Sequence, residues 1–126
     1  MKSNIDRVFY VTFGQRYRHE PHPLLGHSDG WFKIIAPDEE AARLLITSAC
    51  GERWSFMYDS AFNRSHYPLG CLCTLIGGYF IMRGAGGMFF VADLGTELAP
   101  VRASFLHVED CIEWAKANPR QSAPQP

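Results

Sequence analysis

The first predicted element is a strand at residues 5–13, where apolar and polar positions alternate along the chain. A period of two, with aromatic and β-branched residues, is typical of a β-strand. One face of this strand would carry Phe9, Val11 and Phe13, and the other Val8, Tyr10 and Thr12. Because apolar residues occur on both faces, we expect a central strand. The same alternation returns at residues 31–36 and predicts a second strand.

Residues 38–50 carry the period of an α-helix. Pro37 and the three acids after it are typical of a first turn, where proline loses no hydrogen bond and carboxylates face the positive end of the dipole. Gly51 is typical of the residue that ends a helix. The apolar stripe consists of Ala42, Leu45, Ile46 and Ala49, widened by Ala41 and Leu44. We expect this helix to lie across the sheet.

The second half of the chain has shorter apolar runs that are separated by glycines. Alternation predicts further strands, and the glycine-rich residues 84–87 are typical of a hairpin turn. The expected strands are residues 53–58, 71–76, 79–83, 88–92 and 101–105. A helical stripe then begins at Val108, and Pro119 ends it.

Together these patterns predict a single α+β domain at residues 1–120. We expect an antiparallel or mixed β-sheet of five to seven strands, one central helix at residues 38–50 and one C-terminal helix at residues 108–118. Residues 121–126 are polar and contain prolines, and we expect them to form a disordered tail.

The composition is that of a folded domain with little net charge. Of the 126 residues, 47% are hydrophobic and 20% are charged, which excludes general disorder. The formal net charge of −1 gives no field that would draw the whole molecule onto nucleic acid or an anionic membrane. The cysteines are too few for a disulfide scaffold and the N-terminus has no apolar signal segment. We therefore expect free thiols and a cytoplasmic protein.

The longest apolar stretch is residues 69–92, in which Arg83 is the sole formal charge. This stretch contains six glycines, and a membrane helix would lose about 1 kcal/mol at each of them relative to alanine. A buried hairpin is therefore the better interpretation.

Residues 14–31 concentrate charge, aromatic rings and three of the five histidines between two predicted strands. The connection is longer than most loops in a compact domain, which favours a functional loop. Guanidinium groups bind oxyanions in bidentate fashion, and a tyrosine or tryptophan ring can stack on a ligand. The loop therefore fits a nucleotide or another anion. The candidate binding residues are Gln15, Arg16, Tyr17, Arg18, His19, His22, Trp31 and Arg53.

The same loop fits two other interpretations. Tyrosine, tryptophan and arginine are also common anchors of protein interfaces, so the loop could contact a protein. Alternatively, residues 15–17 (Gln15, Arg16 and Tyr17) and His22 could be structural, with the glutamine and histidine side chains capping backbone groups in a long ordered loop.

A metal site is a further hypothesis for this loop. His19, His22 and His27 have the spacing H-x2-H-x4-H, and carboxylates lie nearby in the sequence. Surface histidines are the simpler interpretation, because the prolines beside His22 oppose a compact cage. We expect no cofactor.

Cys71 and Cys73, with His66 before them, are a second candidate metal site. Alternation would place both cysteines on one face of a strand, where thiols pack as small hydrophobic groups. The chain has no nucleophile triad, carboxylate pair or phosphate-binding loop that would predict a catalytic residue.

Several sequence motifs occur together within residues 5–76: VFYVTFGQRYRHEPHP, a DGW entry to a strand, APDEEAARLL, WSFMY and YPLG. In these motifs the chain resembles a group of small uncharacterised proteins of actinobacteria and their phages. The resemblance implies a small β-β-α-β module and no catalytic residue. It covers a little over half of the chain, and Cys71 and Cys73 depart from it.

We expect a non-enzymatic binding protein, of the accessory kind that phages and mobile elements carry for host interaction or anti-defence. It would engage a host protein through residues 14–31 or, alternatively, sequester an anionic small molecule such as a nucleotide. A small metal-dependent hydrolase that uses the loop histidines is the third alternative. Exposed aromatic residues and glycine-rich strands would also fit a homodimer that pairs at a sheet edge.

Overall fold

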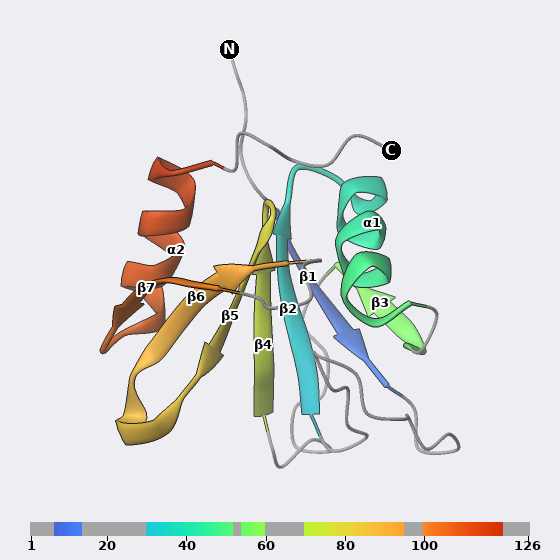
Figure 1. Ribbon diagram of the computed structural model, residues 1–126. Helices are drawn as coiled ribbons and strands as arrows, with labels where there is room; N and C mark the ends of the chain where they lie inside the picture. The colour runs from blue at the N-terminus through green and yellow to red at the C-terminus, as the bar shows by residue number, and fades with distance from the viewer. Residues whose placement is uncertain (1–6, 14–29, 52–53, 60–69, 95–99, 120–126) are drawn as a thin grey trace.

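Seven strands form one mixed sheet in the computed structural model (Figure 1). The structure describes residues 7–13, 30–51, 54–59, 70–94 and 100–119. The order across the sheet is β3-β1-β2-β4-β5-β6-β7, and neighbouring strands are antiparallel except for β2 and β4. The strands are β1 (Arg7–Thr12), β2 (Gly30–Ala36), β3 (Phe56–Tyr58), β4 (Gly70–Ile76), β5 (Tyr79–Arg83), β6 (Phe89–Asp93) and β7 (Val101–Phe105). With one helix on each face, this sheet confirms the predicted α+β fold.

The two strands predicted first pair with each other as β1 and β2. Val11 lies opposite Phe32, and Phe9 lies opposite Ile34. All four side chains are buried, and they share one face because successive residues of a strand point to opposite sides. The predicted alternation is therefore confirmed for both strands.

The helix α1 (Glu39–Cys50) packs on this face of the sheet (Figure 1). Ala42, Ile46 and Ala49 are buried against the strands, as the stripe predicted. Leu44 was predicted to widen the stripe, but this is wrong, because its side chain is 65% exposed. One residue separates Leu44 from Ala42 and from Ile46, and in a helix such a step turns the side chain away from the packed face.

The start of α1 differs by one residue from the prediction. The carboxylate of Asp38 accepts a hydrogen bond from the Ala41 N–H at 2.8 Å, so Asp38 is the N-cap. Pro37 therefore precedes the cap instead of occupying the first turn. At the other end Gly51 has a positive φ of 64°, which supports its predicted role in ending the helix.

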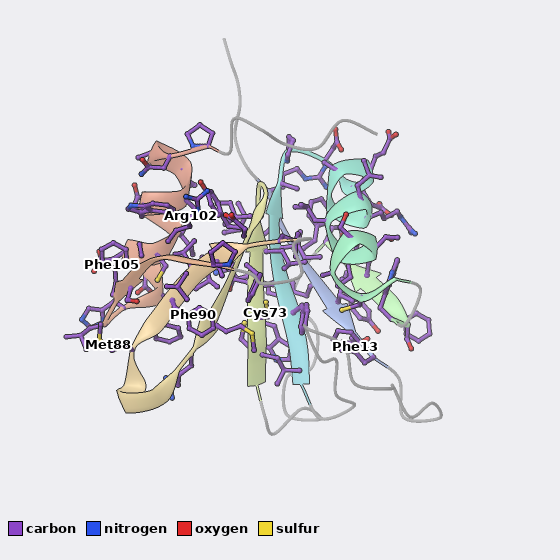
Figure 2. All side chains as sticks on the ribbon, viewed as in Figure 1. Phe13, Cys73, Met88, Phe90, Arg102 and Phe105 are labelled. Atoms are coloured by element: carbon purple, nitrogen blue, oxygen red, sulfur yellow. The ribbon has the colours of Figure 1, made fainter. Side chains whose placement is uncertain are left out.

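The helix α2 (Val108–Ala117) packs on the opposite face. Adjacent residues show this, because Ile34 belongs to the core under α1 whereas Ile35 belongs to the core under α2. Cys111 and Ala115 are the buried residues of α2, in agreement with the predicted stripe. Figure 2 shows the same division, with Phe105 beside α2 and Phe13 on the side of α1.

The hairpin predicted at residues 79–92 is formed by β5 and β6. The Gly84 N–H donates to the Met88 carbonyl at 2.7 Å across the turn, which contains a short 3-10 segment, Ala85–Gly87. Gly86 has a φ of 75° there, a conformation that favours glycine. The hairpin turn that the glycines at residues 84–87 predicted is therefore confirmed.

The strand β3 is shorter than the predicted residues 53–58. It pairs with β1 only from Phe56 to Tyr58. Trp54 instead packs against the core under α1, with the Arg43 guanidinium 5.5 Å from its ring centroid. The alternation of aromatic residues therefore begins at Trp54, before the first paired residue of β3.

A register shift interrupts the parallel pairing of β2 and β4. Trp31 lies opposite Cys71, whereas the next residue, Phe32, lies opposite Cys73. Leu72 is the extra residue, so Cys71 and Cys73 point to opposite faces. The prediction that both thiols share one face is therefore wrong, because it assumed unbroken alternation. Gly30 allows this arrangement, since a Cβ atom there would lie 2.5 Å from the Leu72 side chain.

Candidate functional site

Most of the residues predicted to bind a ligand lie outside the described part of the chain. These are Gln15, Arg16, Tyr17, Arg18, His19, His22 and Arg53, as well as the candidate metal ligand His27. Trp31 is described, and its buried indole lies edge-on to Tyr10, with 5.5 Å between the ring centroids. The flanks of the loop, Phe13 and Gly30, lie at one end of the sheet, because Thr12 and Trp31 pair across β1 and β2.

A pocket of about 500 Å³ opens at this same end, on the α2 side of the sheet. It lies where β2 and β4 begin, β5 ends and α2 starts. Its volume is typical of sites for small molecules. The lining residues are Trp31, Lys33, Cys71, Leu72, Cys73, Thr74, Ile81, Met82, Arg83, Phe89 and Val108.

Among its described lining residues, the pocket has two positive side chains and no negative one. Lys33 comes from β2 and Arg83 from β5. Within the described residues, neither forms an ion pair with a carboxylate. The acids in the first turn of α2, Glu109 and Asp110, are not part of the lining. The local charge is therefore positive, although the whole chain is close to neutral.

An aromatic ring of the pocket contacts one of the two positive groups. The guanidinium of Arg83 lies over the Phe89 ring, 5.1 Å from its centroid, a typical cation–π distance. Ile81 and Val108 add aliphatic surface. A site that combines apolar surface with a few placed polar groups is typical of ligand pockets.

Cys71 brings a thiol to the pocket floor. Its Sγ lies 3.5 Å from the Cys73 carbonyl oxygen and 3.9 Å from the Thr74 hydroxyl. Burial raises the pKa of Cys71 above its usual value, and the contacts with Thr74, the Cys73 backbone and Lys33 offset this only in part. The thiol is therefore protonated at neutral pH, which makes it a poor nucleophile.

The other three cysteines pack in the cores. Burial raises the pKa of Cys50 to about 12, and it also raises the pKa values of Cys73 and Cys111. All four cysteines lie in described segments, and no disulfide joins them. Their chemistry supports packing rather than catalysis.

A second groove lies at the opposite end of the sheet, between α1 and α2. Its volume is about 660 Å³, and its walls are mostly apolar, with Leu44 and Leu45 on one side and Ala115 on the other. Lys116 is the charged residue of its lining. Its described lining holds one charged side chain, whereas the pocket with Lys33 and Arg83 holds two, so that pocket is the stronger candidate for a ligand with polar groups.

Metal ligands and membrane spans were also sought in the described segments. No three histidine, cysteine or acidic side chains cluster there as a metal site would require. Among the described helices, none is long and apolar enough to cross a membrane.

No known protein family, no curated protein and no solved structure matches this chain. The site must therefore be interpreted from its own residues.

Sequence reasoning named Trp31 in this pocket and did not select Lys33 or Arg83. The sequence positions of Lys33 and Arg83 nevertheless set them apart from their neighbours. Lys33 is a charge within the apolar residues 31–36, and Arg83 is the sole charge in residues 69–92. A charge inside a strand that is otherwise apolar has to reach solvent, a partner or a cavity. Their convergence depends on strand order, which the sequence does not specify.

Proposed function

We propose that this protein is a non-enzymatic binder that holds a small anionic molecule in the pocket between α2 and the sheet. The observation that carries the proposal is the pair Lys33 and Arg83, two cations that share one pocket whose described lining holds no acidic residue. Neither cation forms an ion pair with a carboxylate among the described residues. A bound anion would supply that partner.

The pocket supports a ligand with an apolar part as well as a charge. Phe89, Ile81 and Val108 offer apolar surface beside the cations. A guanidinium binds phosphate and carboxylate through paired hydrogen bonds, and lysine adds a point charge. Nucleotides and organic acids both fit this description.

The loop predicted to bind a ligand, residues 14–31, joins two strands at the end of the sheet where the pocket opens. Its described flanks, Phe13 and Gly30, are at the pocket end of the sheet, one residue from Thr12 and Trp31, which pair with each other. Arg16 and Arg18 follow Phe13 in the sequence and lie outside the described residues. Contact with a host protein, metal-dependent hydrolysis and an edge-to-edge homodimer gain no further support from the described residues and stay predictions.

A thermal-shift screen with nucleotides and organic acids tests the proposal. A ligand at a hundred times its Kd should stabilise the fold by about 2.7 kcal/mol, which raises Tm by roughly 10 °C for a domain of this size. The double variant Lys33→Met/Arg83→Met should lose this gain, since methionine keeps the apolar stem and removes the charge.

The matched control is Arg7→Met/Arg43→Met, which removes the same charge outside the pocket. These arginines pair with Asp59 and Glu39 at the surface, where ion pairs contribute little to stability. The control should keep the full ligand-induced shift. A screen in which no anion raises the Tm of the wild-type protein, or a shift that the pocket variant retains, would contradict the proposal.

A further inference from the structure

The strand register fixes how far apart the two cations start. Lys33 on β2 pairs with Thr74 on β4, and Thr74 pairs with Ile81 on β5. Arg83 is two residues further along β5, on the same face as Ile81. The backbone positions of Lys33 and Arg83 therefore lie two strand spacings apart across the sheet and two residues apart along it, which places them roughly 12 Å from each other.

The guanidinium of Arg83 is directed away from Lys33. It lies 5.1 Å from the centroid of Phe89, which is on β6 and directly opposite Arg83. In the sheet order β2-β4-β5-β6, this ring is on the far side of β5 from Lys33. The cation–π contact therefore holds the two positive charges apart instead of letting them converge on one point.

Among the described lining residues, none between the two cations is charged. Thr74 and Cys71 lie there on β4, the strand that separates β2 from β5. Their hydroxyl and thiol groups can accept or donate hydrogen bonds, but they offer no charge to an anion. An anionic group at either end of the pocket is therefore matched by one cation.

We propose that the ligand of this pocket carries two anionic groups, which bind to Lys33 and Arg83 at opposite sides of β4. This inference rests on the proposed function and narrows its ligand to dianions long enough for one anionic group to reach Lys33 while the other reaches Arg83. A ligand with one anionic group would leave one cation without a partner.

Matched pairs of ligands test this inference. The carboxylate pair is octanedioate and its monomethyl ester, and the phosphate pair is hexanediol bis(methyl phosphate) and hexanediol mono(methyl phosphate), in which each phosphodiester carries one negative charge. Within each pair the length is similar and one charge is removed, so a difference in Kd from calorimetry reports the second charge. We expect at least one dianion to bind about tenfold more tightly than its monoanion, as a charge-assisted contact should give. The pair that shows the difference identifies the anionic group.

Single variants then assign the two ends. Lys33→Met and Arg83→Met should each reduce the preference for the dianion to about onefold, whereas Arg43→Met should keep it tenfold. If dianion and monoanion bind equally to the wild type, and the double pocket variant loses both, the two cations share one anionic group. That result would overturn this inference and leave the proposed function intact. Absence of binding by all four probes and by every anion of the screen would overturn both.

Discussion

Cys71 is exposed at the pocket, and the structure gives its thiol an unusual combination of access and low acidity. Its pKa is raised by burial, so the thiolate is scarcer at neutral pH than for a cysteine in water. Because the thiolate is the reacting species, Cys71 contributes a neutral, polarisable surface to the pocket.

Alkylation of Cys71 should therefore depend steeply on pH. Because burial raises the pKa of Cys71, the thiolate fraction is small at pH 7 and grows as the pH rises, so iodoacetamide labelling should accelerate from neutral to alkaline pH. Octanedioate, if it occupies the pocket, should slow the labelling. Mass spectrometry of peptides after timed quenching measures both effects.

The other thiols provide the reference for this experiment. Cys73 and Cys111 are buried and should react only after denaturation, and Cys71→Ser should remove labelling of the folded protein. If Cys71 is labelled at pH 7 as fast as free cysteine, the prediction that its raised pKa slows the reaction is wrong.

At the level of single elements, the cap of α1 is a local interaction with a measurable contribution. Asp38 satisfies the Ala41 N–H, one of the amide groups that a helix N-terminus leaves without a partner inside the helix. The chain thus ends the extended segment after β2 and begins the helix within three residues.

Asp38→Ala should lower the free energy of unfolding by about 1 kcal/mol, because an N-cap side chain contributes roughly 0.5–2 kcal/mol. Asp38→Asn keeps an acceptor and should lose much less. Urea unfolding followed by circular dichroism measures the difference. Glu40→Ala is the control for removing an exposed acid from the same turn; an equal loss in Glu40→Ala would show that charge, and not the cap, is responsible.

The helices and most strands could be predicted because their signals are local. The stripe Ala42, Ile46 and Ala49 and the alternation of β1 each depend on residues within a few positions of one another. The turn at Gly84 is equally local. Such patterns survive folding because the same periodicity that defines an element also defines its buried face.

The features that sequence reasoning missed depend on distant partners. The bulge at Leu72 arises where β4 meets β2, so the separation of Cys71 and Cys73 onto two faces cannot be seen in either strand alone. The pocket is similar, since Lys33 and Arg83 become neighbours only through the order β2-β4-β5. Among the residues of the candidate site, Trp31 was predicted from the sequence, whereas Lys33 and Arg83 were identified only from the structure.

For the whole molecule, the central feature is a sheet with separate cores on its two faces. Ile46 belongs to the core under α1, and Ile81 belongs to the core under α2. Both side chains are almost completely buried. The sheet lies between them, so the two positions share few partners.

Ile46→Ala and Ile81→Ala should each lower the free energy of unfolding by about 2–5 kcal/mol. The losses should add to within about 0.5 kcal/mol in the double variant, as expected for independent sites. Urea unfolding measures all three variants, and Leu44→Ala, at an exposed position, should change stability by less than about 0.5 kcal/mol. A strong departure from additivity would mean that the two cores respond as one.

The parallel contact of β2 with β4 has a consequence for how the chain is assembled. β1, β2, α1 and β3 come from one continuous length of chain, β4 to β7 and α2 come from the next, and these strands are where the two lengths meet in the sheet (Figure 1). Lys33 belongs to the first length and Arg83 to the second. A molecule that bridges them is a noncovalent crosslink between the two halves, and its binding reports directly that they have come together.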